Sequence, residues 1–292
     1  MRPSIVLPTM PVGANPEGID AAAETAERLG WHAAWTTDHL LVPHSAAADY
    51  ATIYDVLLTL AWVGARHSRI RLGTSVIVVP MRNPIVDAKQ IASLDSLTGG
   101  RAIIGVGVGW NAVEFANVGE GDRFHVRGKF LDETILAWRH LFSGSSDPFR
   151  GQFLQFDDFV FGPLPAQGEA LPIVVGGRSA AALRRAGRLG DGFHASSMSP
   201  AQLEAAMPVV RAAASEAGRG EPSFSGRVNV RFSGAPPSAY GITGSPDDMI
   251  REVRAFEAIG VEELVFGFGE TDPERVRNAM ERFDREVLAA IR

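Results

Sequence analysis

Residues 37–40 read Thr-Asp-His-Leu and follow a short apolar segment, residues 33–36. That segment is expected to form a strand, so Asp38 and His39 would lie at its carboxyl end on a rigid support. In α/β barrels the catalytic groups are found at that end of the strands. Histidine titrates near neutral pH, so His39 could accept or donate a proton, with Asp38 as its polar neighbour. The alternative is a capped turn that carries a surface histidine.

A second motif places glycines at alternate positions, Gly105, Gly107 and Gly109, shortly before Asn111. One face of the expected strand 102–108 is therefore bare, which would let a flat ring or another backbone come close. The motif is not a dinucleotide-binding fingerprint, because its glycines lie within the strand and no helix begins at the third one. Asn111 offers both a donor and an acceptor to an amide-like ring edge.

A third motif, Gly176-Gly177-Arg178-Ser179, lies between an expected strand and an expected helix. Backbone N–H groups at a helix start, the helix dipole, the Arg178 side chain and the Ser179 hydroxyl could together bind an anion. A structural turn with a capping serine is the alternative. No Walker loop or zinc-binding motif is present, and no metal site is expected.

Short β-branched segments alternate with amphipathic helical patterns along the whole chain. The expected strands are residues 4–7, 33–36, 72–79, 102–108, 172–175, 192–195, 226–232 and 263–268. Eight strand–helix units predict one α/β domain, residues 1–292, folded as a (β/α)8 TIM barrel, with a doubly wound open sheet as the alternative. The long connections would be insertion loops at the carboxyl-terminal face, covering the barrel mouth, or else insertions without a function. They are residues 110–127, 144–171 and 233–245.

The composition is that of an ordinary globular protein, with 292 residues, 46% of them hydrophobic, and a net charge of −6. This negative charge makes nucleic acid an unexpected partner. The absence of cysteine excludes disulfides and thiolate chemistry. No apolar run reaches the roughly 20 residues of a membrane helix, and no signal peptide is visible. We expect a cytoplasmic protein that binds a small molecule and no membrane.

With these motifs in place, the chain resembles the bacterial-luciferase-like flavin and deazaflavin oxidoreductases, and within them a group thought to use coenzyme F420. The matching stretches are residues 35–40, 71–76, 83–84, 94–101, 105–111, 114–115, 172–179 and 189–192. The resemblance implies a (β/α)8 barrel with a flavin or deazaflavin ring at its carboxyl end. It also implies a non-proline cis peptide bond at Ser75-Val76, whose bulge supports the back of the ring.

The same resemblance assigns roles to residues of this chain. Asp38, His39 and Asn111 would line the ring, with Gly107 on the bare strand beside it. The phosphate of the cofactor would be held by Gly176, Gly177, Arg178 and Ser179. His39 is the expected proton donor or acceptor, with Asp38 next to it. Barrels of this family usually form homodimers, and the almost wholly apolar helix expected at residues 54–65 agrees with this. Burial of that helix under a long loop is the alternative.

The leading interpretation is an F420-dependent oxidoreductase that moves a hydride between the deazaflavin and an organic substrate. One alternative is a luciferase-like monooxygenase that uses reduced FMN, and another is a cofactor-binding barrel without turnover. A metal-dependent hydrolase would need a His-x-His pair, which the chain lacks.

Sugar phosphates are doubtful substrates. The sugar-phosphate dehydrogenases of the family carry a glutamate in the strand-four motif, a tryptophan soon after the Asp-His pair, and lysines for the phosphate. This chain has no glutamate within residues 105–111, no tryptophan within residues 40–44, and only two lysines, Lys89 and Lys129. A less polar substrate is suggested by the phenylalanines on the long connections, Phe115, Phe124, Phe153 and Phe159.

Overall fold

A computed structural model describes residues 1–10, 12–50, 52–233 and 239–292. In these residues, eight parallel strands form a closed barrel. The strands are β1 (Arg2–Val6), β2 (Ala33–Thr36), β3 (Arg71–Thr74), β5 (Ala102–Gly107), β8 (Ile173–Gly176), β9 (Gly192–Ser196), β10 (Ser223–Arg231) and β12 (Glu263–Gly267). They pair in the order β10-β12-β1-β2-β3-β5-β8-β9, and pairing of β9 with β10 closes the ring. The expected (β/α)8 barrel is confirmed.

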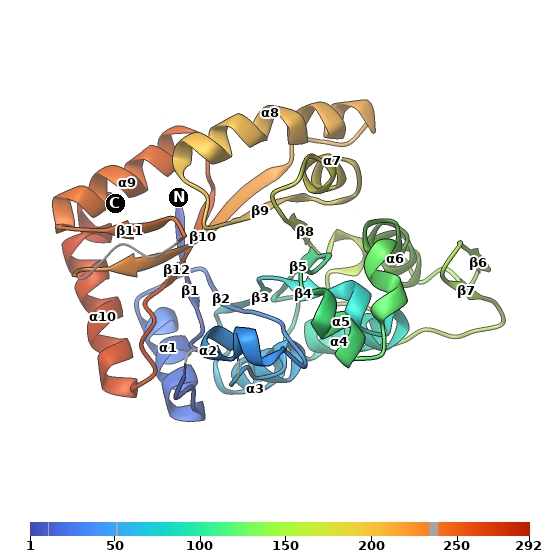
Figure 1. Cartoon of the computed structure of the whole chain (residues 1–292), viewed down its shortest axis with the longest axis horizontal. Coiled ribbons are helices and arrows are strands. Elements are labelled where there is room, and N and C mark those ends of the chain that lie inside the picture. Colours follow the sequence, from blue (N-terminus) through green and yellow to red (C-terminus); the bar gives the residue numbers. More distant parts are fainter. Residues whose placement is uncertain (11, 51, 234–238) are drawn as a thin grey trace.

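The helices surround the strands as an outer layer (Figure 1). They are α1 (Pro16–Arg28), α3 (Val56–Arg66), α4 (Pro84–Leu97), α6 (Arg127–Phe142), α7 (Ala180–Leu189), α8 (Pro200–Glu216), α9 (Pro246–Ala258) and α10 (Pro273–Glu286). Several helices begin with a polar cap residue followed by proline, as at Ser199-Pro200 and Asp272-Pro273. The cap side chain accepts a backbone N–H of the first turn, and proline has no N–H that would need an acceptor there. No helix in the described ranges is long and apolar enough to cross a membrane.

The apolar core has two parts. The larger lies between the strands and the helices. A smaller cluster fills the barrel interior below its carboxyl end, and it consists of Ala33, Trp35, Ile103, Val174 and Val265. The barrel interior is therefore packed rather than an open channel, and it supports the carboxyl ends of the strands, where the site of such barrels lies.

The third expected strand, residues 72–79, is interrupted. β3 ends at Thr74, the Ser75–Val76 peptide bond is cis, and the chain resumes as β4 (Ile77–Val78), which pairs with β5. The predicted cis bond is thus confirmed. The interruption forms a bulge at Ser75 and Val76 that points into the barrel mouth, because both residues line the cavity described below.

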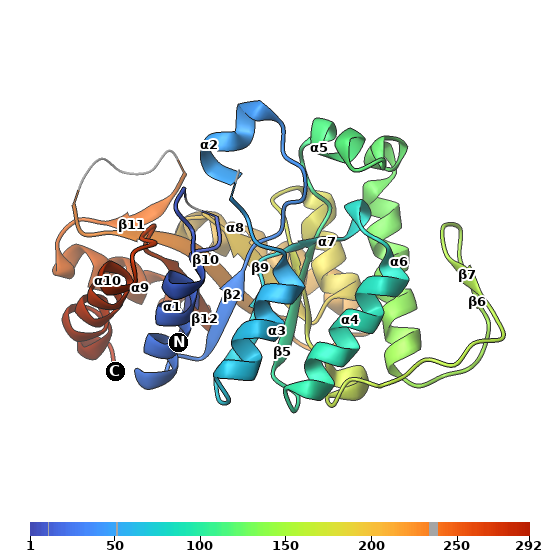
Figure 2. The same ribbon diagram turned by 90° about the horizontal axis from the view of Figure 1, so that it is seen from below.

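Two of the connections at the carboxyl-terminal face contain short helices. The one after β2 contains a short helix, α2 (Ala47–Tyr50), and the one after β5 contains α5 (Ala112–Asn117). Figure 2 shows both helices on the same side of the barrel. Asn117 Nδ2 donates to Leu41 O at 3.0 Å and joins the two connections.

The expectation that residues 144–171 cover the mouth is wrong. This connection leads from α6 to β8, so it arrives at the amino end of a strand, away from the mouth. Its hairpin, β6 (Phe149–Arg150) and β7 (Gln155–Phe156), lies beside α6 (Figure 2). Residues 159–161 of the same connection form no strand.

The third long connection, residues 233–245, follows β10. It contains β11 (Gly241–Thr243), which adds to β10 as a parallel strand. Residues 234–238 of this connection lie outside the described residues.

Candidate active site

A cavity with a volume of about 250 Å³ opens at the carboxyl ends of the strands. Among the residues predicted from the sequence, those that line it are Asp38, His39, Ser75, Val76, Gly107, Gly176 and Gly177. Further lining residues are Thr37, Tyr50, Val78, Val108, Gly109, Trp110, His194, Ser196 and Arg227. The fold therefore brings most of the predicted site together in one place.

The other three predicted residues do not line the cavity. Asn111 caps α5, and its Oδ1 accepts the N–H groups of Val113 and Glu114 at 3.1 and 3.3 Å. Ser179 caps α7 in the same way. Arg178 Nη2 donates to the backbone carbonyls of Ser196 and Ser197, at 2.6 Å each. The structure thus gives each of these side chains a local partner within the protein.

His39 forms a buried pair with Glu114. Its Nδ1 lies 2.8 Å from Glu114 Oε2, while Glu114 Oε1 accepts the N–H of Leu40 at 2.7 Å. Burial would raise the pKa of the Glu114 carboxyl, but the hydrogen bonds from His39 and Leu40 hold it below its usual value. An ionised Glu114 favours the proton on Nδ1, which leaves Nε2 of a neutral imidazole as the acceptor.

The second face of His39 packs against aromatic rings. The Tyr50 ring lies 4.2 Å from the imidazole, and the Trp110 ring lies 6.3 Å away at 78°. Tyr50 comes from α2 and Trp110 from the connection after β5. The imidazole is therefore held at the mouth by the connection after β2, through Tyr50, and by the connection after β5, through Trp110 and Glu114.

Asp38 is fully engaged with Arg82. Arg82 Nε and the N–H of Val78 both donate to Asp38 Oδ2 at 2.9 Å, and Arg82 Nη2 lies 2.5 Å from Oδ1. Asp55 and Asp87 also flank this guanidinium, at 3.0 and 3.8 Å. Asp38 thereby fixes the end of β2 to β4, and the geometry favours a positioning role over proton transfer.

Glycines of β5 and β8 make room for the bulge. A Cβ on Gly107 would lie 2.5 Å from Val76 Cγ2, and one on Gly105 would lie 2.0 Å from Thr74 O. A Cβ on Gly176 would lie 2.9 Å from Val76 Cγ1. The space left by these glycines is therefore filled by the bulge itself, which the bare strand supports from behind.

His194 holds Ser75 in place. His194 Nε2 lies 2.8 Å from Ser75 Oγ, and Nδ1 lies 2.8 Å from Ser225 Oγ. The imidazole stacks on Trp35 at a centroid distance of 4.7 Å. Burial, together with the nearby Arg227 charge, lowers the pKa of His194 to about 3, so this imidazole is neutral at working pH.

The turn after β8 has the features of an anion site. Gly177 has φ 135°, a conformation that residues with a Cβ rarely adopt. Within the described residues, the N–H groups of Gly177, Arg178 and Ser179 donate to no protein acceptor. These donors are exposed at the start of α7, where the helix dipole favours negative charge.

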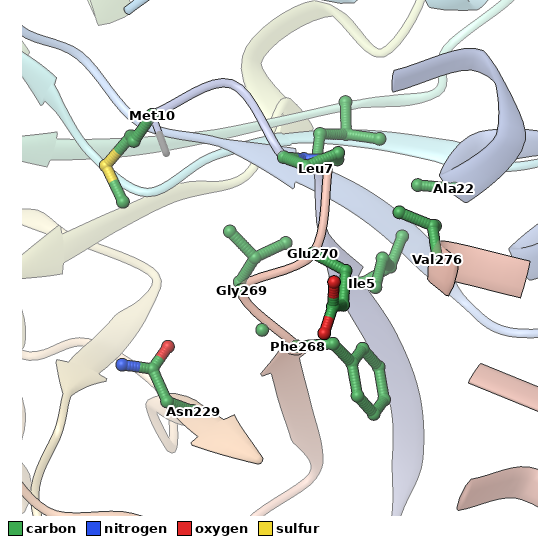
Figure 3. A pocket seen from close by; sticks show the side chains of 12 residues that line it. Ile5, Leu7, Met10, Ala22, Asn229, Phe268, Gly269, Glu270 and Val276 are labelled. Atoms are coloured by element: carbon green, nitrogen blue, oxygen red, sulfur yellow. The ribbon is translucent and has the colours of Figure 1, made fainter. Parts of the chain in front are cut away.

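A second, smaller cavity of about 70 Å³ lies at the ends of β1, β10 and β12. Figure 3 shows Leu7, Met10 and Phe268 around it, with the Asn229 amide at one side. The phenylalanines on the long connections are not part of either cavity. Phe115 is buried against Val78 and Met81.

Sequence reasoning missed four residues of this site, Arg82, Glu114, His194 and Arg227. Glu114 follows the N-cap residue of α5 by three positions, which is a local signal for a helix start but not for a contact with His39. The other three come from strands or turns distant in sequence. Only the closed barrel places them around the bulge.

Comparisons with known proteins agree with this architecture. A family model described as luciferase-like monooxygenase matches residues 4–239. The F420-dependent glucose-6-phosphate dehydrogenase of Nocardia farcinica (strain IFM 10152) is 33% identical over 227 residues, which are 75% of this chain and 65% of that protein. The chain therefore matches just under two thirds of the length of this relative.

Two solved structures share the fold. An F420-dependent secondary alcohol dehydrogenase, in complex with an F420-acetone adduct, has a TM-score of 0.84 at 18% identity, over 100% of this chain and 99% of that one. The oxygenating constituent of 3,6-diketocamphane monooxygenase of Pseudomonas putida, in complex with FMN, has a TM-score of 0.79 at 17% identity, over 98% and 97% of the two chains.

The closed barrel carries its cavity at the carboxyl ends of the strands, as (β/α)8 enzymes do. The chain belongs to the luciferase-like monooxygenase family, because the family model covers well over half of its length.

Proposed function

We propose that the protein is an F420-dependent oxidoreductase that transfers a hydride between the deazaflavin and a small, fairly apolar organic substrate. The observation that carries the proposal is the position of the His39–Glu114 pair, which lines the same cavity as the Ser75–Val76 bulge. F420 dependence is supported by the relative of 33% identity, which uses this cofactor.

The residues present fit such a cofactor. The bulge, backed by Gly107 and Gly176, offers a surface for a flat ring, and the turn at Gly177 offers backbone N–H groups for a phosphate. When bound, F420 would supply the carbon that accepts or donates the hydride. His39 would then hold or take the proton of the reacting substrate group at Nε2, with Glu114 fixing its tautomer.

The lining of the mouth supports a fairly apolar substrate. Trp110, which is 60% exposed, and Tyr50 present aromatic surface. The small cavity at the ends of β1, β10 and β12 is lined by Leu7, Met10 and Phe268 (Figure 3). Neither lysine of the chain lines a cavity at the mouth, which argues against a sugar phosphate. Small secondary alcohols and ketones are suitable first probes, because a structural neighbour was solved with an F420-acetone adduct.

A monooxygenase that uses reduced FMN is the alternative, since an FMN complex shares the fold at a TM-score of 0.79. A barrel that binds the cofactor without turnover is the second alternative. All three proposals place a ring in the same cavity, and they differ in the identity of the ring and in whether a substrate reacts.

Titration of the purified protein with F420 and with FMN, followed by fluorescence, tests the cofactor. We expect tighter binding of F420 than of oxidised or reduced FMN. Sub-micromolar binding of FMN without detectable binding of F420 would replace the proposal by the alternative. Binding of F420 with no turnover of any alcohol or ketone probe would favour the second alternative.

The phosphate turn is tested by Gly177→Asp, which adds a side chain and a negative charge among the free N–H donors. We expect at least about a tenfold loss of F420 affinity. Gly218→Asp is the matched control, because Gly218 also has a positive φ, 67°, and has open space around it. Unchanged F420 affinity in folded Gly177→Asp would show that the phosphate binds elsewhere.

A further inference from the structure

Arg227 places a positive charge in the cavity, and none of the roles described above involves this charge. It projects from β10, and its Nη1 donates to Thr37 Oγ1 at 2.7 Å and to Ser75 O at 3.1 Å. The guanidinium is thus tied to the carbonyl of the bulge residue. Its Nε and Nη2 groups have no acceptor among the described residues, and the side chain lines the cavity.

The protein provides no counter-charge for Arg227 within the described ranges, where it forms no salt bridge. The two acids nearest the site are already engaged, Asp38 by Arg82 and Glu114 by His39. His194, which lies beside Arg227, is neutral. Burial lowers the pKa of the Arg227 guanidinium, which reflects the cost of an uncompensated charge at this position.

Arg227 is only partly exposed, and a partly buried cation without a partner is stabilised when a bound anion supplies the missing charge. A guanidinium is planar and carries its donors in a fork, so it suits a flat, delocalised anion with acceptors along one edge. The bulge to which Arg227 is bonded is also the surface proposed for the cofactor ring. Position and charge therefore favour the ring over the substrate as the partner.

We infer that Arg227 binds the cofactor ring in its anionic form and makes the site selective for that form. The inference rests on the proposed function, since it concerns the ring of F420. Oxidised F420 carries a hydroxyl group conjugated with its ring, and loss of this proton spreads a negative charge over the ring system. The role assigned to Arg227 is electrostatic and is separate from the proton transfer assigned to His39.

The ionisation of the bound ring tests the inference without any turnover. The absorption band of F420 shifts when the ring ionises, so a pH titration of the complex reports the pKa of the bound ring. In the unmodified protein we expect this pKa to lie at least one unit below that of free F420, which corresponds to at least tenfold tighter binding of the anion. If the ring had the same pKa in free and in bound F420, the inference would be overturned. An anionic substrate would then be the remaining candidate partner of Arg227.

Three variants separate charge from packing. Arg227→Met removes the charge, and we expect the bound-ring pKa to rise by at least one unit. Arg227→Lys keeps the charge and should stay within half a unit of the unmodified protein. Arg184→Met removes an exposed arginine of α7 and should have no effect. Equal ionisation of the ring in the Met and Lys variants would show that Arg227 only braces the bulge.

The titration also distinguishes failure of the inference from failure of the proposed function. If the unmodified protein does not bind F420, the proposed function fails. If it binds F420 but leaves the ionisation of the ring unchanged, only the role of Arg227 fails. Should Arg227→Met bind too weakly to titrate, comparison of the unmodified complex with free F420 still decides the question.

Discussion

His39 and Glu114 form the pair on which the proposed chemistry depends. Glu114 is buried and holds the imidazole by Nδ1 at 2.8 Å, so the histidine has one orientation and one favoured tautomer. This arrangement, in which a carboxylate orients a histidine, is shared by many general bases. Asp38, its neighbour in sequence, serves a different purpose, because Arg82 occupies both of its oxygens.

Replacement of His39 tests this division of roles. We expect His39→Ala to lower turnover by about 10²–10⁴-fold, the usual contribution of a positioned acid or base, and to change F420 affinity by less than about tenfold. Glu114→Gln should lower turnover by about tenfold or more, with similar affinity, because the tautomer is no longer fixed. Steady-state kinetics and F420 titration provide both readouts.

The control is His125→Ala, which removes an exposed histidine from the carboxyl-terminal face and should leave both values unchanged. Severe loss of F420 binding in folded His39→Ala would make His39 a ligand of the ring rather than a proton carrier.

His194 makes stability depend on pH. Its pKa falls from the usual 6.5 to about 3 in the folded protein, so between these values the unfolded chain binds a proton that the folded protein does not. The stabilisation is complete above about pH 6.5 and is lost as the pH falls toward 3. From pH 7 to pH 5 the loss is about 2 kcal/mol.

Other groups titrate in the same range, so the comparison must be made with a variant. Burial raises the pKa of Asp87 to about 7, so Asp87 adds stability as the pH falls, opposite to His194. Burial lowers the pKa of His32 to about 4, so His32 reduces stability as the pH falls, as His194 does. We therefore expect the stability difference between the unmodified protein and His194→Gln to shrink by about 2 kcal/mol from pH 7 to pH 5 and to be flat above pH 8. Urea unfolding measures it. A constant difference would show that His194 does not titrate as described.

At the scale of elements, the site depends on four strands that fit together around one bulge. β3 and β4 carry it, and β5 and β8 accommodate it with glycines. The connections after β2 and β5 then close over it with Tyr50 and Trp110. The glycines of β5 therefore make room for the bulge, and they affect ligand binding indirectly, through the position of the bulge.

Gly107→Ala tests this packing. The new Cβ would lie 2.5 Å from Val76 Cγ2, so either the bulge or β5 must move. We expect a loss of about 1–3 kcal/mol in the free energy of unfolding, as is usual for overpacking, together with weaker F420 binding. Gly220→Ala is the control, since no atom lies within 4 Å of its added Cβ. Equal stability of the two variants would mean that the bulge adapts without cost.

At the scale of the whole molecule, α3 and α4 expose an apolar face. Leu58 is 69% exposed and Leu97 is 86% exposed, and both line an apolar groove between these helices. Trp62, Ile85 and Val86 are also partly exposed nearby. Such a face is costly to leave in water, and we propose that a second copy of the chain covers it.

The mass in solution tests the homodimer. We expect a dimer at micromolar concentration and a monomer for the double variant Leu58→Arg and Leu97→Arg, because two charges would be buried in the interface. Val160→Arg is the control, since Val160 is 99% exposed but lies on the α6–β8 connection. A monomeric mass for the unmodified protein would contradict the proposal.

The sequence by itself determined the barrel and the location of its site. Periodicity gave eight alternating strands and helices, and the polar residues after β2 and β8 mark strand ends, which a parallel barrel must gather at one mouth. The cis bond at Ser75-Val76 was predictable only through the family resemblance. These features are local, because each depends on a few neighbouring residues.

Tertiary structure decided what each polar side chain does. Asp38 meets Arg82, His39 meets Glu114, and Arg227 meets the bulge, over separations of 44, 75 and 152 residues. The partner of a side chain across the barrel depends on strand register and loop path, which no local pattern encodes. The connection at residues 144–171 shows the same limit, since its length suggested a lid while its position between α6 and β8 placed it beside a helix.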